Sequence, residues 1–240
     1  MNWILIYQKE LIHNHSVNLT GERHTHIRSI LKKEKDETIQ VVVPFSGNYL
    51  FKITSISESE TRLEISNSIP DILKPLAIQT FFSLPRPQTG KKILHLSGAY
   101  GVTSVFFYAT ESKNKEYWTS PVYTKDSISY LETGLSQTGN NKLPNLHLSQ
   151  SEPWKPFLKS WKGTVLILDR EGEFFSNNAP EIQKSWDDLL FVFGPESGWK
   201  PGDILFFKEC EFKLLSLGKI NLRTEFAYSA LLHQLFSIRN

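Results

Sequence analysis

The first seventy or so positions of the chain alternate between apolar and polar side chains over short runs. A period of two is typical of half-buried strands, so these runs predict a small antiparallel sheet or barrel. We expect its strands at Thr38–Val43, Tyr49–Ile56 and Arg62–Ile65. One amphipathic stretch interrupts them at about Glu22–Lys33, where Ile27 and its apolar neighbours repeat at a helical spacing and predict a helix.

The rest of the chain alternates between compact apolar runs and helical patterns. The apolar runs lie at Ile78–Leu84, Val102–Tyr108, Thr164–Leu168, Leu189–Phe193 and Lys213–Leu217. Such runs suit strands that are buried on both faces of a sheet. The helical patterns lie at Lys91–Tyr100, Ser127–Leu135, Pro180–Ser185, Pro201–Phe207 and Arg223–Phe236. Strands that alternate with helices predict an α/β fold with a parallel sheet covered by helices.

The two patterns meet at Asn67–Pro75, which has the composition of a linker, with two prolines in six residues. We therefore expect one domain at residues 1–70 and a second at residues 75–240, and the 240 residues are enough for both. The last predicted helix carries an apolar stripe of Tyr228, Leu231, Leu232 and Leu235. Periodicity leaves open whether this stripe faces the core or a second subunit.

The composition indicates an ordinary globular chain. Apolar residues make up 40% and charged residues 22%, which argues against wholesale disorder. The 27 basic and 25 acidic side chains leave a net charge of +2, so a nucleic-acid surface requires local clustering. The single cysteine, Cys210, excludes an internal disulfide. No apolar run approaches the ~20 residues of a membrane span, and Met1–Tyr7 lacks the basic start of a signal peptide. We expect a cytoplasmic protein without a membrane partner.

Several familiar binding and catalytic patterns do not fit. Thr89–Lys92 lacks the upstream glycine and the final Ser or Thr of a phosphate-binding loop. Gly134–Gly139 is one residue too long for a nucleophile elbow, and the chain contains no Gly-x-Gly-x-x-Gly. The His-x-His pairs at 13–15 and 24–26 share a face only on a strand, and the second pair falls in the predicted helix. We therefore expect no metal site.

Positive charge is concentrated in two stretches. Residues 22–35 contain Arg23, Arg28, Lys32, Lys33 and Lys35. Residues 74–92 contain Lys74, Arg86, Lys91 and Lys92, with no acidic residue. Clustered lysine and arginine side chains are typical of contacts with nucleic-acid phosphates. The same clusters also fit a solvated surface, and charge alone does not separate the two interpretations.

Three predicted strands run directly into loops that contain glycine. The strand ending at Phe193 continues as Gly194–Gly198, the one ending at Leu217 as Gly218–Glu225, and the one ending at Leu168 as Asp169–Gly172. Ligands of open α/β sheets bind outside the carboxyl ends of the strands, where glycine lets the backbone approach closely. Each loop alone fits an ordinary strand–helix turn, but the three together predict one composite pocket.

Two of these loops carry specific motifs. Gly194-Pro-Glu-x-Gly198, followed by Leu217-Gly-x-x-x-Leu-Arg-Thr-Glu225, resembles the signature of the RsmE-type ribosomal RNA uridine N3-methyltransferases of the SPOUT superfamily. Further segments resemble that family in the same order along nearly the whole chain. They are His26–Lys32, Tyr100–Val102, Thr110–Glu111, and Gln137–Gly139 with Lys142 and Pro144.

The resemblance implies a small N-terminal PUA-like β-barrel that binds RNA, followed by a SPOUT methyltransferase domain with a deep trefoil knot. It implies S-adenosylmethionine as the cofactor, S-adenosylhomocysteine as the product, and a homodimer. The implied reaction is methylation of N3 of a uridine in 16S ribosomal RNA, with ribosomal RNA or the small ribosomal subunit as the partner. Because the cofactor supplies the methyl group on an electrophilic sulfur, no metal is required.

The resemblance also assigns residues by position. The cofactor pocket is expected to contain Leu168, Phe193, Gly194, Glu196, Ser197, Gly198, Leu217, Gly218, Leu222 and Thr224. RNA contacts are expected from Arg23, His26, Arg28, Lys32, Arg86, Lys91 and Lys142.

The catalytic candidates are Arg223 and Glu225. A guanidinium beside the uracil carbonyls would stabilise the anion that develops as N3 loses its proton. Glu225 would accept that proton or orient Arg223. The alternative is that the two residues form only a cap or an ion pair at the start of a helix.

Four positions depart from the family pattern. Ser197 stands where the family has a glycine, Asn140 and Ser112 replace arginines, and Phe226 replaces a small residue after Arg-Thr-Glu. These departures leave two other functions open. The chain could be a non-catalytic RNA-binding or ribosome-assembly protein on the same fold, or a methyltransferase acting on a different RNA.

Overall fold

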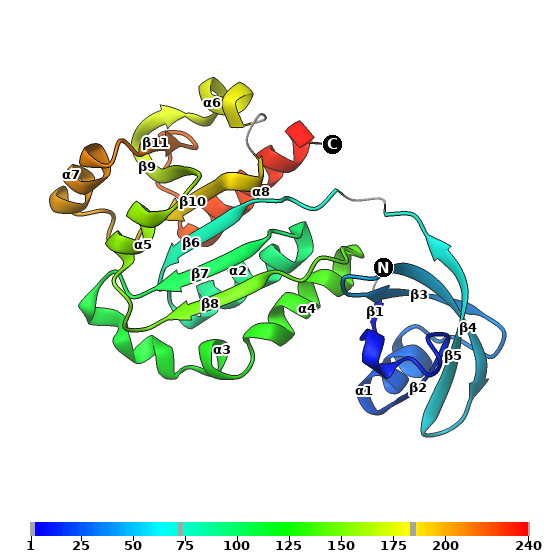
Figure 1. The fold of residues 1–240 in the computed structure, drawn as a ribbon. Coiled ribbons are helices and arrows are strands. Elements are labelled where there is room, and N and C mark those ends of the chain that lie inside the picture. Colours follow the sequence, from blue (N-terminus) through cyan, green and yellow to red (C-terminus); the bar gives the residue numbers. More distant parts are fainter. Residues whose placement is uncertain (1–2, 72–73, 183–185, 240) are drawn as a thin grey trace.

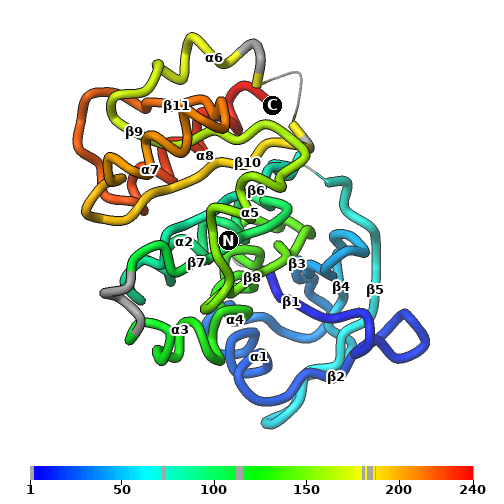
Figure 2. Tube along the Cα trace, turned by 60° about the vertical axis from the view of Figure 1, so that its left-hand side comes forward, coloured from blue at the N-terminus to red at the C-terminus, as the bar shows by residue number. Residues whose placement is uncertain are grey.

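The computed structural model describes residues 3–71, 74–182 and 186–239 (Figure 1). Two separate sheets organise the chain, one of five strands in the N-terminal part and one of six in the C-terminal part. Figure 2 shows the same trace from a second direction, with the N-terminal strands gathered on one side of the larger sheet. Within the described residues, no helix combines the length and the apolar character needed to cross a bilayer.

The N-terminal sheet has the strand order β1-β3-β4-β5-β2. Its strands are β1 (Ile4–Leu5), β2 (Ser16–Thr20), β3 (Thr38–Val43), β4 (Gly47–Ile56) and β5 (Glu60–Ile69). All neighbours are antiparallel except β1 and β3. The predicted antiparallel sheet is therefore confirmed, with β1 and β2 as additional strands. Alternate residues such as Val41, Phe51 and Leu63 are fully buried and form its core.

Two boundaries in this part differ from the prediction. The helix ends earlier than expected, because α1 (Gly21–Thr25) passes into a π-helical turn at His26–Ile30, and Lys32 then has a left-handed φ of +50°. The predicted linker is also shorter, since β5 continues to Ile69 by pairing with Asn48 of β4. Pairing with a neighbouring strand outweighs the polar composition of this segment.

The C-terminal sheet is entirely parallel, with the order β11-β9-β10-β6-β7-β8, so the predicted α/β fold with a parallel sheet is confirmed. The strands are β6 (Gln79–Ser83), β7 (Ser104–Tyr108), β8 (Asn145–Ser149), β9 (Thr164–Phe174), β10 (Leu189–Phe193) and β11 (Lys213–Ser216). The predicted run Thr164–Leu168 is too short. The strand continues through Gly172, because β11 shifts its register at a bulge and pairs again with Glu173 and Phe174.

Helices bury both faces of this sheet, so neighbouring strand residues point into different cores. Phe82 belongs to the core beneath α2 (Pro87–Tyr100) and α8 (Thr224–Arg239), whereas Phe81 belongs to the core beneath α5 (Trp154–Ser160) and α7 (Pro201–Glu209). The remaining helices are α3 (Pro121–Thr124), α4 (Ser127–Thr138) and α6 (Phe175–Ile182), with 3-10 turns at Gln8–Glu10, Ser112–Thr119 and Trp186–Asp188. The predicted helix at Pro180–Ser185 lies earlier in the chain, as α6, and residues 183–185 fall outside the described residues.

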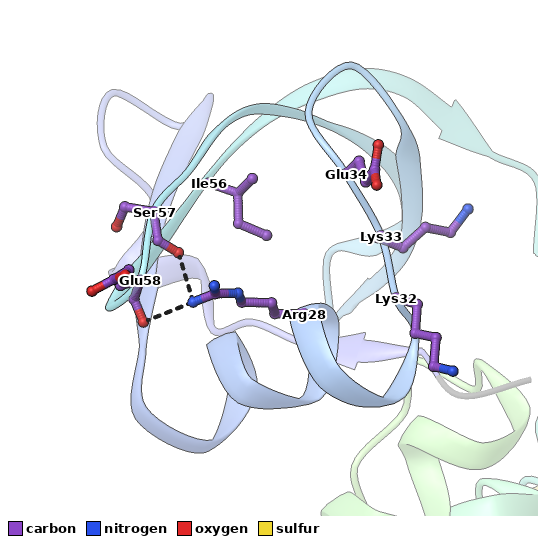
Figure 3. A pocket seen from close by; sticks show the side chains of 7 residues that line it. All are labelled: Arg28, Lys32, Lys33, Glu34, Ile56, Ser57 and Glu58. Carbon is purple, nitrogen blue, oxygen red and sulfur yellow. Dashed lines mark hydrogen bonds between the residues drawn. The ribbon is translucent and has the colours of Figure 1, made fainter.

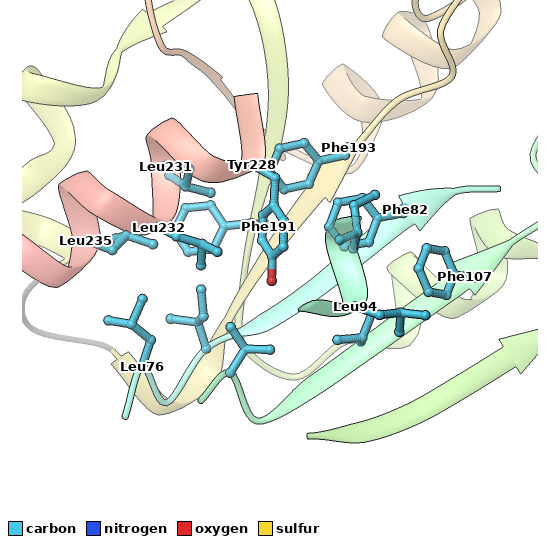
Figure 4. Close-up of a cluster of buried hydrophobic side chains, with 14 of the residues drawn as sticks. Leu76, Phe82, Leu94, Phe107, Phe191, Phe193, Tyr228, Leu231, Leu232 and Leu235 are labelled. Carbon is cyan, nitrogen blue, oxygen red and sulfur yellow. The ribbon is translucent and has the colours of Figure 1, made fainter. Parts of the chain in front are cut away.

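The apolar stripe of α8 faces the core. Tyr228, Leu231, Leu232 and Leu235 are completely buried against β6 and β10 (Figure 4). The Tyr228 ring meets Phe82 and Phe193 edge-on, at centroid distances of 5.0 and 5.4 Å. Its hydroxyl lies 2.8 Å from the Ser97 hydroxyl of α2. The alternative that this stripe contacts a second subunit is therefore wrong.

The two sheets meet at the end of α4. The amide of Trp3 donates to the Ser136 carbonyl at 2.7 Å, and the Asn48 side chain donates to the Gly139 carbonyl at 2.8 Å. The Asn141 side chain donates to the Asp71 carboxylate at 2.7 Å. These hydrogen bonds, together with an apolar contact formed by Trp3, Val42 and Leu135, hold the N-terminal sheet against the C-terminal part.

Candidate functional site

The candidate site lies at the carboxyl edge of the C-terminal sheet. Since all six strands are parallel, the loops that follow β6, β7, β9, β10 and β11 leave the sheet at the same edge. This topology brings together the segments that carry the sequence motifs.

The loop after β10 is built around Trp199. An added Cβ on Gly194 would come within 2.7 Å of the Trp199 ring, so a side chain at this position is excluded unless the ring moves. The indole nitrogen of Trp199 donates to the Leu168 carbonyl on β9 at 3.2 Å. Gly198 closes the turn by donating to the Pro195 carbonyl, with a φ of +81° that favours glycine. Trp199 thus ties the end of β10 to β9.

Two polar contacts fix the other side of this loop. The Ser197 hydroxyl donates to the Glu111 carboxylate beyond β7 at 2.9 Å, and Glu196 pairs with Arg86 beyond β6 at 3.1 Å. Ser197 stands where the resembling family has glycine, yet it does not have a positive φ. The serine therefore fits the backbone of the loop without strain and adds a contact to Glu111.

The loop after β11 is fixed by hydrogen bonds at its start and exposed to solvent further along. The Ser216 hydroxyl both donates to the Gly218 carbonyl and accepts from the Gly218 amide, each at 3.1 Å. Gly218 has a φ of +128°. In the described chain, the amides of residues 219–222 donate to no backbone carbonyl, and the side chains of Ile220 and Leu222 are exposed.

Helix α8 begins with the two catalytic candidates. The Arg223 carbonyl accepts from the amides of Phe226 and Ala227, so this residue starts the helix, while its exposed guanidinium makes no hydrogen bond or ion pair with a described residue. Glu225 is buried and accepts from Lys92 of α2 at 3.1 Å. Glu225 therefore pairs with Lys92, and not with Arg223.

The charge of Glu225 is stabilised where it is buried. Burial by itself would raise the pKa of the Glu225 carboxyl, but hydrogen bonds from its own backbone amide and from Lys92 outweigh burial. Together with the positive charges of Lys92 and Arg223 they lower this pKa below its ordinary value. Glu225 is thus a carboxylate at neutral pH.

Helix α2 connects the two motif loops. Arg86, immediately before the helix, holds Glu196, and Lys92 on the helix holds Glu225. Six residues of α-helix span about 9 Å. The glycine loop after β10 and the start of α8 are therefore held close together by a single rigid element.

Some of the predicted cofactor residues offer only their backbone to the site, and others offer a side chain. Phe193 points away from the loops, stacked on Phe82 at 4.8 Å, so only its backbone faces the site. Leu217 packs on the main core and Leu168 offers its carbonyl to Trp199, whereas Leu222 is 39% exposed. An added Cβ on Gly198 or on Gly218 would meet no atom within 4 Å. The site thus offers open backbone with apolar side chains beside it, which suits a nucleoside-containing ligand.

The predicted RNA contacts fall in separate places. Arg28 and Lys32 line a hollow of about 460 Å³ on the N-terminal sheet (Figure 3). Its other lining residues are Lys33, Glu34, Ile56, Ser57 and Glu58. Arg28 donates to the carbonyls of Ser57 and Glu58 across this hollow.

Other members of that set have internal partners. Arg23 pairs with Glu10 at 2.6 Å and donates to the Leu5 carbonyl, and His26 is half-buried beside it. The neighbouring His24 is buried, with its ring nitrogens on Thr61 and the Glu58 carbonyl. These contacts stabilise the N-terminal sheet.

On the C-terminal part, Lys91 lies over the Tyr130 ring at 5.0 Å, and Lys142 is exposed. Asn140, which replaces a family arginine, is 3% exposed and donates to the carbonyls of Gly98 and Lys142. It is a structural residue between α2 and α4. The side chain of Ser112, the other replaced arginine, falls outside the described residues.

Three residues of this site were not assigned from the sequence: Lys92, Glu111 and Trp199. Lys92 belongs to a basic run and Glu111 to a recognised Thr-Glu pair, but neither pattern indicates a partner 133 or 86 residues away. Trp199 follows the glycine motif, and its position there was the one available signal. Among the described residues, no three His, Cys, Asp or Glu side chains gather as they would around a metal ion.

Known proteins resemble this chain over most of its length. A family model described as the RNA methyltransferase domain matches residues 73–235. The ribosomal RNA small subunit methyltransferase E of Treponema pallidum (strain Nichols) is 26% identical over 239 positions, covering 96% of this chain and 88% of that protein.

Solved structures share the fold. A ribosomal RNA small subunit methyltransferase E from Neisseria gonorrhoeae, bound to S-adenosyl methionine, superposes with a TM-score of 0.79 at 20% identity and covers 98% of both chains. A protein from Legionella pneumophila in complex with the same cofactor superposes with a TM-score of 0.75 at 20% identity, covering 99% of this chain and 98% of that one.

Proposed function

The chain belongs to the RNA methyltransferase domain family, and on this premise we propose that it transfers a methyl group from S-adenosylmethionine to N3 of a uridine in small-subunit ribosomal RNA. One observation carries the proposal. Arg86, just before helix α2, holds the glycine loop at Glu196, and Lys92 on α2 holds the start of α8 at Glu225; this supports one site formed by the open backbone of these loops and by Arg223, whose guanidinium pairs with none of the described residues. The likeness to the Treponema pallidum enzyme supports the choice of RNA.

The loops after β10 and β11 fit the cofactor. Space beside Gly198 and Gly218, the amides of residues 219–222 and the Leu222 side chain would hold the nucleoside through backbone hydrogen bonds and apolar contact. Trp199 keeps the loop after β10 in the required conformation. When bound, the cofactor supplies a methyl group on a positively charged sulfur.

Arg223 would act on the uracil. N3 would give up its proton to solvent and take the methyl group as the bond from that group to the cofactor sulfur breaks. Negative charge would develop on the two ring carbonyl oxygens, and a guanidinium beside them would stabilise it. Glu225 has a different role. A carboxylate whose pKa is lowered is a weak base, so we assign Glu225 to holding Lys92 and the start of α8.

The wider architecture is also part of the proposal. We assign residues 1–70 to a PUA-like domain that binds RNA through the hollow at Arg28 and Lys32, and residues 75–240 to a SPOUT domain whose C-terminal segment is knotted. The strand order β11-β9-β10 supports the knot, because the last strand, β11, pairs with β9 and not with β10, the strand before it in the chain. A homodimer in the cytoplasm, with the small ribosomal subunit as partner, completes this assignment.

Calorimetric titration with S-adenosylhomocysteine tests the cofactor site. We expect a micromolar dissociation constant, about −8 kcal/mol, for the wild-type chain and for Arg223→Ala. Gly194→Val should abolish binding, because its side chain collides with Trp199 while the fold, checked by circular dichroism, is retained. No binding by the wild type at millimolar ligand would overturn the enzyme function and leave an RNA-binding protein.

Methyl transfer to unmodified small ribosomal subunits tests the substrate. Labelled S-adenosylmethionine should modify N3 of a uridine there and leave bulk transfer RNA unlabelled. Arg223→Ala should lower the rate by about 100-fold or more, as loss of a charge-stabilising group does in other enzymes. Labelling of transfer RNA instead would assign the activity to a different RNA.

A further inference from the structure

Exposed apolar side chains gather beside Arg223. Ile220, Leu222 and Phe226 are 74%, 39% and 56% exposed. They are three of the nine large hydrophobic side chains that are exposed in the described chain, and they fall within seven residues. Such clustering on an otherwise polar surface marks a place where something binds.

Phe226 has the geometry of a platform next to the candidate catalytic group. It lies three residues after Arg223 in the first turn of α8, so both side chains extend from the same side of the helix. The Phe226 amide donates to the Arg223 carbonyl at 3.0 Å, which fixes the two backbones relative to each other. The core stripe of Tyr228 and Leu232 leaves from the opposite side.

One face of the Phe226 ring is already occupied by a cation. The Lys92 ammonium lies 5.8 Å from the ring centroid and is held in place by its ion pair with Glu225. A cation at this distance is attracted to the ring and restricts its orientation. An exposed aromatic ring restrained on one face, with an exposed arginine on the same side of the helix, suits the stacking of a planar base and the binding of its polar edge.

We propose that Phe226 stacks on the target uracil and presents the carbonyl edge of the base to Arg223, with Lys92 backing the ring. This inference rests on the proposed methyltransferase function and names the residue that holds the base. A stacked base is displaced from the RNA helix or loop, so Phe226 acts as a binding and specificity residue.

Photo-crosslinking tests the contact directly. Small-subunit RNA transcribed with 5-iodouridine should crosslink to Phe226 in the tryptic peptide Thr224–Arg239. Phe226→Leu should lose this crosslink, and Phe226→Trp should keep it. Absence of any crosslink in this peptide would overturn the inference, whether or not the wild type methylates RNA.

Kinetics give the second readout. Phe226→Leu should lower kcat/KM for RNA about tenfold or more, as loss of one stacked base does, with Phe226→Trp within about threefold of wild type. The dissociation constant for S-adenosylhomocysteine should stay within about twofold. Phe45→Leu, which changes a phenylalanine that is 65% exposed in the turn between β3 and β4, is the matched control and should leave kcat/KM unchanged.

Two outcomes separate this inference from the proposed function. If the wild type methylates RNA and Phe226→Leu is as fast, the stacking role is wrong and the function stands. If Phe226→Leu instead shifts the sedimentation of the chain from dimer to monomer, Phe226 belongs to a subunit interface and the inference is likewise overturned. Failure of the wild type to bind S-adenosylhomocysteine counts against the proposed function, while the crosslink still decides the RNA contact.

Discussion

At the scale of single residues, the ion pair of Lys92 and Glu225 joins an exposed side chain to a buried one. The Glu225 side chain is 7% exposed and the Lys92 side chain 56% exposed, so a buried carboxylate depends on a cation at the surface. Removing the cation leaves a buried charge with fewer partners, and this costs more than losing an exposed pair.

We expect Lys92→Met to lower the free energy of unfolding by about 1 kcal/mol at pH 7. The folded-state pKa of Glu225 is lowered, so the contribution of the pair is present above the carboxyl's unfolded pKa. It is lost as the pH falls through the folded-state value. Urea unfolding at pH 7 and below pH 4 should therefore show the difference from wild type shrinking in acid.

Lys52→Met is the matched control, because it removes a lysine that pairs with the exposed Asp36. It should shift the urea midpoint less than Lys92→Met does. A loss for Lys92→Met that is equally large in acid would show that packing of the lysine stem, and not the ion pair, stabilises the fold.

At the scale of elements, the contact between α2 and α4 depends on two glycines. An added Cβ on Gly98 would overlap the Leu131 carbonyl, and one on Gly134 would overlap the His95 carbonyl. The two helices therefore approach backbone to backbone. This approach sets the position of α2, which in turn carries Lys92 and follows Arg86.

We expect Gly98→Ala to destabilise the protein by about 1–3 kcal/mol, although alanine favours helices by about 1 kcal/mol over glycine. The reason is that the obstacle is backbone, which cannot rotate away. Thermal unfolding should show a lower Tm for Gly98→Ala. Gly202→Ala in α7 is the control, since an added Cβ there meets nothing within 4 Å, and its Tm should be unchanged or higher.

At the scale of the whole molecule, the hydrogen bonds around Gly139 hold the two sheets together. Asn48 reaches Gly139 from β4, Trp3 reaches Ser136 from the N-terminus, and the Tyr7 hydroxyl donates to Glu132. Burial beside Glu132 raises the pKa of Tyr7, so the hydroxyl stays protonated and keeps donating. The junction fixes where the hollow at Arg28 lies relative to the site on α8.

Asn48→Ala should loosen this junction without unfolding either part. The loss of one buried hydrogen bond, about 1 kcal/mol, corresponds to roughly fivefold faster opening. Hydrogen exchange should accelerate at the amides of Trp3 and Phe45, which bond across the junction, and remain unchanged in α7. Thr54→Val, on an exposed part of β4, should change neither. Unchanged exchange at Trp3 in Asn48→Ala would mean that the apolar contact alone holds the parts together.

The sequence by itself determined the type of most elements. Short apolar runs such as the one that contains Phe81 and Phe82 suit strands covered on both faces, and their alternation with helical patterns predicted a parallel sheet with helices. The pattern did not predict β8 or α5, because the first is only partly buried and the second contains a proline. β8 lies at the sheet edge and has no fully buried residue, and α5 contains Pro156. That proline is tolerated because it occupies the first turn, where the missing amide has no helical partner.

Tertiary structure alone decided which distant residues meet. No local pattern relates Lys92 to Glu225, Ser197 to Glu111 or Trp199 to Leu168, because strand order and not sequence spacing brings them to one edge of the sheet. The same packing turned the Tyr228 stripe inward and left Phe226, two residues earlier, exposed beside Arg223. Motifs thus identified the segments of the site, and packing decided which of their side chains are buried, paired or free to meet a ligand.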